Sequence, residues 1–446
     1  MATIHFNDAL RLAAISLQNA DLPDAPKVRV IRDIYGRLRF ALDCPLMDYP
    51  AAALSQLQQA QASLGPYATN SELLSHDSFS DPQAVFGNTD WHRTLVELGA
   101  DEEGESLGTA EIQLLDRQIT GQDWLRPPME GGAAHPHRFV FFGLKGGVGR
   151  STALCMTAWG LAQRGKKVLL IDFDLESPGL SGLVLPAKKG ADFGVVDWLL
   201  EDAVGQGDAI LPRMVSASPL AETTVGAIRI AAAMGAGELD YLAKLSRAYA
   251  DVPSASGPQR MGVRMRNMVE QLEALEKPDV VLIDSRGGLH DLAAVSITGL
   301  ADTALLFATA GAQSWSGYGQ LFSHWQHRPD VAKHVRERLV IVRALTPKTD
   351  REASVRGFQR QAYELFAQTL YDELPAEQVE GGDLFHPDEK DESAPHFPIL
   401  VDWDERFQEV DPMLRADDGG ATPAQIEAAF GQLIARLLSR LDGDAA

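Results

Sequence analysis

The most informative part of the sequence is GLKGGVGRST at residues 143–152. It follows a short apolar run at residues 139–142 and precedes a stretch with helical spacing that continues to Arg164. Glycines let backbone N–H groups turn inward around phosphate oxygens, and the N-terminus of the following helix adds a favourable dipole. A strand, a glycine-rich loop and a helix in this order form the context of a phosphate-binding loop. The alternative, a glycine turn before a core helix, is weakened by the motifs found downstream.

Beyond this loop, the second part of the chain alternates apolar runs with helical stretches. The expected strands lie at residues 168–171, 228–230, 280–283, 304–307, 339–342 and 397–400. Continuous apolar strands separated by helices indicate a mainly parallel sheet that helices cover on both faces. The sequence therefore predicts an α/β domain of the P-loop NTPase class over residues 138–446.

The first part of the chain has a different pattern, in which apolar and charged residues alternate. Residues 28–30 and 38–42 show this alternation, which is typical of a β-hairpin with one buried face. Helices are expected at residues 51–64 and 112–124. We therefore predict a small α+β N-terminal domain over residues 1–126, whose role the sequence does not reveal.

Residues that break regular structure gather between the two parts, so residues 127–137 are the predicted linker. These breakers are Pro127, Pro128, Gly131, Gly132 and Pro136. The acidic residues 376–395, which contain Gly and Pro, are expected to form a mobile surface loop. Histidines in the linker and in this loop lack metal-ligand spacing and are interpreted as solvated. They are His135, His137, His386 and His396.

The composition narrows the class of protein. Of the 446 residues, 45% are hydrophobic and 23% are charged, as in an ordinary soluble globular protein. The formal net charge of -22 should repel nucleic acid and anionic lipid over most of the surface. Two cysteines, Cys44 and Cys155, are too few for a disulfide framework. No secretory signal opens the chain, and no apolar segment approaches the roughly 20 residues of a membrane helix, so we expect a cytoplasmic location.

Two weaker features have alternative interpretations. The hairpin at residues 27–39 is basic and could dock nucleic acid or an acidic partner, but we favour a solvated face whose charge meets the protein's own acids. Its cations are Lys27, Arg29, Arg32, Arg37 and Arg39. Residues 422–441 carry one apolar stripe at helical spacing, with Thr422 as the expected N-cap and Pro423 at the first helical position. Because few cations flank this stripe, we expect it to pack against the sheet rather than to bind a membrane.

Three motifs of the second part resemble those of the ParA/MinD family of deviant Walker-A ATPases. KGGVG at residues 145–149 resembles the family's signature, and GKKVLLIDFD at residues 165–174 resembles the segment that follows it. KPDVVLID at residues 277–284 resembles the Walker B strand. The resemblance covers roughly residues 138–440 in order and spacing. It implies a protein that binds ATP and Mg²⁺, hydrolyses ATP and forms a homodimer in the ATP state.

The resemblance also implies roles for individual residues in nucleotide binding. Lys145 matches the signature lysine, which in such dimers reaches across to the partner's nucleotide. Gly288 matches the switch II glycine near the γ-phosphate. The expected phosphate cradle and its neighbours are Gly146, Gly147, Val148, Gly149, Arg150, Ser151 and Thr152.

Acidic residues at two strand ends are the candidates for metal and water. By the resemblance, Asp174 orients the attacking water, Ser151 binds Mg²⁺, and Asp284 holds Mg²⁺ through water. We include Asp172 among the candidate metal ligands. The alternative for Asp172 and Asp174 is a pair of strand-end acids that cap the next helix.

The chain departs from the family pattern in three places. Arg150 stands where the family has the loop lysine, and we expect it to contact phosphate and to contribute to catalysis; the resemblance associates this arginine variant with bacterial conflict systems. Arg286, in switch II, is expected to sense the γ-phosphate, or else to pair with Asp291 or another acid. Residues 343–347 stand where relatives often place a base-reading asparagine, so adenine specificity comes from the resemblance alone.

Three functions remain open from the sequence. The leading hypothesis is slow, Mg²⁺-dependent ATP hydrolysis that gates a homodimer, with an unidentified protein partner bound through the N-terminal domain. The second is a scaffold dimer in which bound nucleotide is structural and hydrolysed little or not at all. The third is a kinase, which ranks last because no acceptor signature is found.

Overall fold

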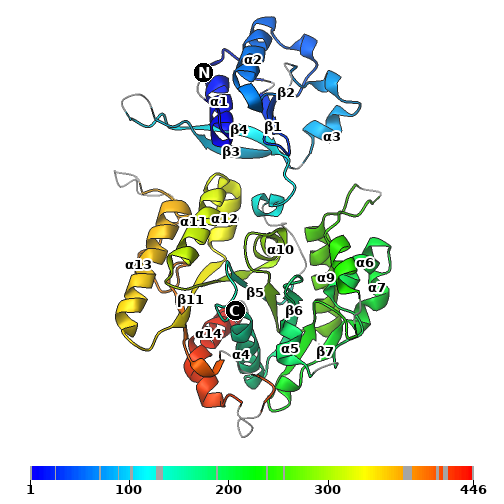
Figure 1. The fold of residues 1–446 in the computed structure, drawn as a ribbon, viewed down its shortest axis with the longest axis vertical. Helices are drawn as coiled ribbons and strands as arrows, with labels where there is room; N and C mark the ends of the chain where they lie inside the picture. Colours follow the sequence, from blue (N-terminus) through cyan, green and yellow to red (C-terminus); the bar gives the residue numbers. More distant parts are fainter. Residues whose placement is uncertain are drawn as a thin grey trace. The chain divides into compact units, whose positions relative to one another are not determined.

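The computed structural model describes twelve stretches of the chain. They are residues 3–25, 27–69, 72–88, 90–100, 104–126, 134–186, 189–237, 240–254, 257–374, 384–407, 411–414 and 420–443. The chain divides into two compact units, which Figure 1 shows in colours that follow the sequence. The first unit comprises residues 1–126 with 326–329, and the second comprises residues 127–325 with 330–446. No helix within the described stretches is long and apolar enough to cross a bilayer.

The first unit is a four-stranded sheet with helices packed on its apolar face. The strand order is β2-β1-β4-β3, in which only the β1–β4 pair is parallel. Val30, Phe40 and Leu57 are fully buried in its core. The main elements are α1 (Phe6–Asn19), β1 (Val28–Arg32), β2 (Leu38–Leu42), α2 (Ala51–Ser63), α3 (Pro82–Phe86), β3 (His92–Glu97) and β4 (Thr109–Asp116).

The predicted hairpin and the helix at residues 51–64 are confirmed, but the helix expected at residues 112–124 is wrong. Its first half is the inner strand β4, which bonds to both β1 and β3, and its second half is a short 3-10 turn at Gln122–Leu125. Ile112 and Leu114 face the core as alternate residues of a strand. Residues 109–116 form a strand because they pair with β1 on one side and with β3 on the other, and neither pairing is visible in their own sequence.

The basic hairpin is largely neutralised within its own unit. Arg29 contacts Asp43 at 2.8 Å, Arg37 contacts Asp33 at 2.8 Å, and Arg32 binds Asp116 through both carboxylate oxygens. Burial alone would raise the pKa of Asp116, but the hydrogen bonds and charge of Arg32 hold it below its usual value. These contacts support the interpretation that the cations meet the protein's own acids.

The second unit contains one eight-stranded sheet in the order β12-β11-β10-β5-β9-β6-β8-β7. All neighbouring pairs are parallel except β7–β8 at one edge. The strands are β5 (His137–Gly143), β6 (Lys167–Phe173), β7 (Val215–Ala217), β8 (Ala227–Ala231), β9 (Val280–Ser285), β10 (Thr303–Ala308), β11 (Leu339–Thr346) and β12 (Ile399–Asp402). The predicted α/β class, with a mainly parallel sheet, is confirmed.

Helices cover both faces of this sheet. Phe139 and Phe141 of β5 pack in one core with α4 and α14, whereas Phe142 meets Tyr318 of α11 on the other face at 6.3 Å between ring centroids. Arg138 of β5 also points to that second face, where it forms a buried ion pair with Glu273 of α9 at 2.7 Å. The longer helices are α4 (Arg150–Gln163), α6 (Val195–Ala203), α8 (Tyr241–Ala248), α9 (Met261–Glu276), α11 (Ala312–Gln326), α12 (Pro329–Arg336), α13 (Arg351–Thr369) and α14 (Pro423–Gly443), and the shorter ones are α5 (Leu180–Val184), α7 (Gly207–Ile210) and α10 (Asp291–Ala294).

The C-terminal helix α14 packs as core, as predicted. At its N-terminus the Thr422 backbone N–H donates to Oε1 of Gln425 at 2.9 Å, and the Gln425 backbone N–H donates to Oγ1 of Thr422 at 3.3 Å. Pro423 is the first residue of the helix. In Figure 1 α14 lies beside α4. The approach is close, because a Cβ on Gly160 of α4 would lie 2.4 Å from the Cδ1 atom of Ile434. The apolar stripe is therefore used within the unit.

Two expectations in the second unit need correction, and one strand is added. Strand β12 begins at Ile399 rather than at residue 397, because Pro398 cannot donate to a ladder. The edge strand β7 was not predicted. The interpretation of His396 as solvated is wrong: it is fully buried, and its ring nitrogens lie 2.6 Å from the Tyr371 hydroxyl and 3.1 Å from the Glu389 carbonyl. Part of the expected loop at 376–395, residues 376–383, lies outside the described residues.

Candidate nucleotide-binding site

The glycine-rich loop connects the end of β5 to the start of α4. Gly147 and Gly149 have φ values of 78° and 75°, a left-handed conformation that side chains other than glycine rarely adopt. A Cβ added at Gly146 or Gly147 would meet no atom within 4 Å, so the loop faces open space. The N-terminus of the 14-residue helix α4 points to the same place. The local backbone therefore has the form that binds phosphate groups.

A cavity of about 590 Å³ lies against this loop. Its volume falls within the roughly 300–1,000 Å³ typical of small-molecule sites. One wall is formed by residues 145–152, and the opposite wall comes from the ends of β11 and β12 and from the segments after them. The residues of the second wall are Leu345, Val401, Asp402, Trp403, Asp404, Phe407 and Phe430. This wall is largely apolar beyond its two acids, which suits the flat ring of a base next to the phosphate loop.

Two carboxylates meet beneath the loop because the strands that carry them are neighbours. Asp172 of β6 is in register with Asp284 of β9, and both side chains are buried. The Ser151 hydroxyl, in the first turn of α4, donates a hydrogen bond of 2.7 Å to Oδ2 of Asp284. Burial raises the pKa of Asp284, although the nearby Arg150 guanidinium and the Ser151 hydroxyl oppose the rise.

Arg150 contacts carboxylates rather than the loop in this structure. Its Nε donates to Oδ1 of Asp284 at 2.7 Å, and its Nη2 donates to Oδ2 of Asp174 at 2.8 Å. Only 10% of the side chain is exposed. Burial would lower the pKa of Arg150, but the two carboxylates raise it above its usual value. The guanidinium thus joins two of the acids that the sequence assigned to metal and water.

Asp172 behaves as the capping alternative describes. Its two carboxylate oxygens accept backbone N–H bonds from Asp174 at 3.0 Å and from Leu180, the first residue of α5, at 3.3 Å. Burial and the charge of Asp284 raise its pKa well above the usual value. Both oxygens are already in use, so the geometry gives no support to Asp172 as a magnesium ligand, and that role stays a prediction.

Ser151 and Asp284 fit the first ligands of a magnesium ion. Mg²⁺ binds oxygen atoms and is usually held by one or two carboxylates together with substrate phosphates. Within the described residues, no group of three or more His, Cys, Asp or Glu side chains could hold a metal by itself. A metal here would therefore depend on oxygens brought by the nucleotide.

The remaining loop residues differ in exposure. Lys145 is exposed, and its ammonium group donates a hydrogen bond to Gln313 in the first turn of α11. Val148 is buried under the loop, with Cγ2 3.3 Å from where a Cβ on Gly143 would lie. Thr152 lines the cavity with the glycines. The sequence therefore identified one whole wall of the cavity.

A family model described as an AAA domain matches residues 138–228, which include the glycine-rich loop, α4 and β6. A search of curated proteins finds no match. The match agrees with the nucleotide-binding geometry of this segment. Together with the mainly parallel sheet it supports a P-loop NTPase fold for the second unit.

Several solved structures match parts of this chain at low sequence identity. A ParA family ATPase from Chlorobium tepidum TLS is 14% identical, with 67% of this chain and 98% of that chain covered and a TM-score of 0.42. McdA from Cyanothece in complex with ATP is 14% identical, with coverage of 67% and 98% and a TM-score of 0.39. Cobyrinic acid a,c-diamide synthase from Mycobacterium smegmatis, with bound ATP analog and magnesium, is 17% identical, with coverage of 54% and 86% and a TM-score of 0.37.

Residues 286–288, which follow β9, lie directly beside the glycine-rich loop. Gly288 has a φ of 83° and its N–H donates to the Gly143 carbonyl at 3.2 Å. Arg286 forms an ion pair with Glu176, which also accepts a hydrogen bond from the Tyr249 hydroxyl. Pairing with an acid was the alternative to a phosphate sensor, and Glu176 is that acid. The sensor role stays a prediction.

Sequence reasoning missed two groups of residues at this site. Glu176 lies only two positions after Asp174, so its proximity to switch II could have been expected. The wall formed by Trp403, Phe407 and Phe430 carries no motif, and it reaches the loop only because β12 and α14 pack against β11 and α4.

Proposed function

We propose that this chain binds ATP with Mg²⁺ in the cavity at residues 145–152, hydrolyses it slowly, and uses the bound nucleotide to favour a homodimer. The main support is the Ser151 hydroxyl, 2.7 Å from the buried Asp284 carboxylate and directly below the glycine-rich loop. These two oxygens can bind the magnesium ion of a nucleoside triphosphate. The helix N-terminus and the backbone N–H groups beside them can bind its phosphates.

Each part of the site has a distinct task in this proposal. Phosphoryl transfer depends on positioned groups and electrostatic stabilisation, with little covalent help from the protein. The N–H groups of residues 146–149 bind phosphate oxygens, and Ser151 and Asp284 hold the metal, which when bound draws charge from those oxygens. Asp174 follows β6 at the same sheet edge and orients water.

Arg150 has to exchange partners for this to happen. Its guanidinium is planar and binds two oxygens at once, as it does with Asp284 and Asp174. Phosphate oxygens offer the same geometry with more charge, so we expect Arg150 to turn to them when nucleotide binds. Asp174 would then lose its cation and be free to accept a hydrogen bond from water.

The second candidate is a scaffold dimer that holds nucleotide without hydrolysing it. The observation in its favour is the contact of 2.8 Å between Arg150 and Asp174. If this ion pair persists with ATP bound, the carboxylate stays engaged and is a poor partner for water. Single-turnover hydrolysis by the purified protein separates the two candidates. Binding without turnover above buffer, with its partner present, would replace the enzyme by the scaffold.

The dimer is tested through Lys145. This residue is exposed, so its ammonium can reach a second subunit. To do so it would exchange its hydrogen bond with Gln313, at the start of α11, for a contact across the dimer. Light scattering should show an ATP-analogue-dependent dimer for the wild type and a mostly monomeric Lys145→Ala variant. Lys333→Ala removes an exposed lysine of α12 and is the matched control, which should dimerise normally. Equal monomer fractions in wild type and Lys145→Ala would refute the role.

The biological setting is a further part of the proposal. The N-terminal unit is the candidate docking domain for a protein partner, and the arginine in the loop suggests a conflict system. The genes that neighbour this one test the second point, since a conflict system should include a toxic or nucleolytic effector nearby.

A further inference from the structure

Arg343 of β11 is a buried cation without an acidic partner. It is 5% exposed, and its Nη1 and Nη2 donate to the Ala344 carbonyl at 3.1 Å and to the Ser354 hydroxyl oxygen at 3.2 Å. Its Nε is buried with no hydrogen-bond partner, and no carboxylate of the described chain forms an ion pair with it. Burial accordingly lowers the pKa of Arg343. Charged side chains are almost never this deeply buried unless they are paired.

Other buried arginines of the same unit follow the usual rule. Arg138 contacts Glu273 at 2.7 Å, and Arg336 contacts Asp372 at 2.8 Å. The absence of such a carboxylate at Arg343 is therefore a local property. It leaves a positive charge at this position whose counter-ion has to come from elsewhere.

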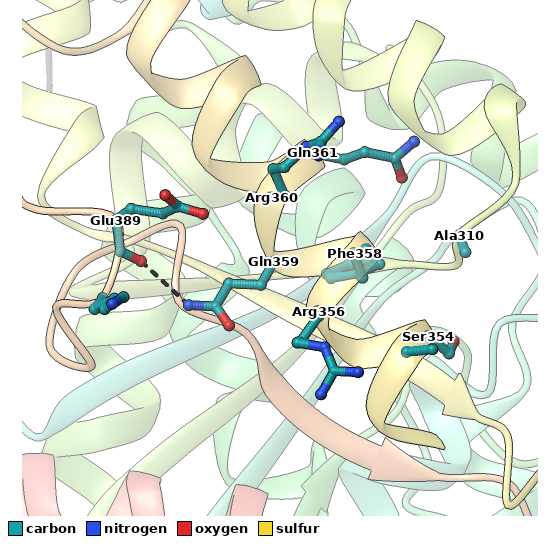
Figure 2. Close-up of a pocket in the computed structure, with 11 residues that line it drawn as sticks. Ala310, Ser354, Arg356, Phe358, Gln359, Arg360, Gln361 and Glu389 are labelled. Atoms are coloured by element: carbon teal, nitrogen blue, oxygen red, sulfur yellow. Dashed lines mark hydrogen bonds between the residues drawn. The ribbon is translucent and has the colours of Figure 1, made fainter. Parts of the chain in front are cut away.

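A surface cavity of about 810 Å³ lies along the first half of α13 (Figure 2). Two of its lining residues are the ones that Arg343 touches: Ser354, by the hydrogen bond, and Phe358, whose ring centre is 5.1 Å from the guanidinium carbon. The Ser354 oxygen accepts from Arg343, which leaves the hydroxyl proton to be donated into the cavity. Ser354 also lies in the first turn of the 19-residue helix α13, where the helix dipole favours an anion.

The rim of this cavity adds positive charge. Arg356, Arg360 and Lys390 line it together with one acid, Glu389, in a chain whose net charge is -22. Figure 2 shows Gln359 reaching across to the carbonyl of Glu389, a bond of 3.1 Å that holds the opposite side of the groove. Arg356 and Arg360 pair with exposed acids of their own helix at 3.3 and 3.1 Å. Exposed pairs of this kind contribute little and exchange readily.

We propose that this groove binds an acidic peptide segment of a partner protein, with a carboxylate against the Ser354 hydroxyl above Arg343. The lining follows α13 from Ala353 to Gln361. Eight steps of about 1.5 Å give roughly 12 Å. That length suits about four residues of extended chain at ~3.3 Å each. A free phosphate ion would fill a small part of it. The groove shares no lining residue with the nucleotide cavity, so this inference does not rest on ATP binding.

The test is fluorescence anisotropy with the full chain, without nucleotide, and a labelled tetra-glutamate peptide with capped ends. A tetra-glutamine peptide is the matched probe. We expect the glutamate peptide alone to bind, more weakly as ionic strength rises from about 0.05 M to about 0.5 M. Ser354→Ala and Arg343→Met should each weaken binding about tenfold or more, because a charge-assisted hydrogen bond is lost.

The rim and a remote cation supply the controls. Arg356→Gln should weaken the glutamate peptide about threefold, as expected for an exposed charge. Arg213→Gln, an exposed arginine paired with Asp192 at the other edge of the sheet, should leave binding unchanged. Equal binding to wild type and Ser354→Ala, or equal binding of the two peptides, would overturn the proposal. Complete displacement of the peptide by inorganic phosphate at equal concentration would overturn it in favour of a small-oxyanion site.

Discussion

Arg150 and Arg343 are both largely buried arginines of the second unit, and they differ in what surrounds their charge. Arg150 lies between Asp284 and Asp174 at 2.7 and 2.8 Å, whereas Arg343 donates its hydrogen bonds to a carbonyl and to the Ser354 hydroxyl and forms no ion pair with a described acid. A ligand that needs Arg150 must compete with two carboxylates already bound to it. A ligand that approaches Arg343 meets no such competitor among the described residues.

The difference shows that burial of a cation does not by itself define a binding site. At Arg150 the neighbouring acids hold the charge in a ligand-free arrangement that nucleotide has to rearrange. At Arg343 the charge is preorganised, and an incoming anion supplies the missing partner. Substitutions that remove either cation, or its neighbours, test this contrast.

The largest effect, on ATP affinity, is expected for Arg150→Ala. The variant loses the cation and leaves Asp174 and Asp284 as uncompensated charges that repel phosphate, so measurable ATP binding should disappear. Arg150→Lys keeps the charge and should remain within about tenfold of wild type, or roughly 1.4 kcal/mol. Calorimetry with ATP and Mg²⁺ gives both values. ATP affinity equal to wild type in Arg150→Ala would show that the assignment of the loop is wrong.

The second largest effect, on the rate of ATP hydrolysis, is expected for substitution of Asp174. In Asp174→Ala, hydrolysis should fall by about a hundredfold or more, as expected for loss of a positioned acid–base group. ATP affinity should change little, because the cradle and Ser151 remain. Single-turnover rates and calorimetry are compared with those of Asp192→Ala, an exposed acid paired with Arg213. Parallel losses of rate and affinity would instead assign Asp174 to the metal or to folding.

A smaller effect is expected at the Arg286–Glu176 ion pair. If Arg286 leaves Glu176 for the γ-phosphate, Arg286→Ala should weaken ATP about tenfold more than ADP, which corresponds to roughly 1.4 kcal/mol. Glu176→Gln should act in the opposite direction, because it releases Arg286. The affinities of both nucleotides for both variants decide the matter. Equal effects on ATP and ADP would leave the arginine as a structural contact.

The smallest change, in the free energy of unfolding, is expected for Arg343→Met. Comparison with Arg138→Met separates an arginine without a carboxylate partner from one that has such a partner. Since no carboxylate is stranded, the free energy of unfolding should stay within about 1 kcal/mol of wild type or rise. Arg138→Met leaves Glu273 buried and unpaired, so it should destabilise the protein by about 3–5 kcal/mol. Denaturant unfolding of the two variants measures both. A larger loss for Arg343→Met than for Arg138→Met would contradict the contrast.

Much of the fold was predictable because its signals are local. Apolar runs at residues 168–171 and 280–283 are continuous, and a strand buried on both faces requires that pattern. The stripe of α14 was likewise assigned to the core from its spacing and from its few flanking cations. The prediction of a helix at residues 112–124 was wrong because β4 is stabilised by pairing with β3, and β3 is short and has no distinct sequence pattern.

At the site, too, some features could be predicted from the sequence and others could not. Glycines with positive φ, a hydroxyl two residues after Gly149 and acids at strand ends follow from the sequence, because backbone conformation and strand polarity place them at one sheet edge. The sequence brings Glu176 near Arg286 but does not choose it over other acids such as Asp291, because the packing of the loops decides which acid Arg286 meets. The full burial of His396 and its contact with Tyr371 were equally out of reach.

The glycine-rich loop, the parallel sheet that carries it and the acids beside it follow from the sequence, because each depends on residue type at short spacing. The partners of the buried charges follow from tertiary packing. Arg150 meets Asp284 across 134 positions, and Arg343 forms an ion pair with none of the acids that the structure describes. The physical reason is that a buried cation is stabilised by whichever groups the folded chain brings within a few ångströms, and that choice depends on strand order and helix packing rather than on neighbours in sequence.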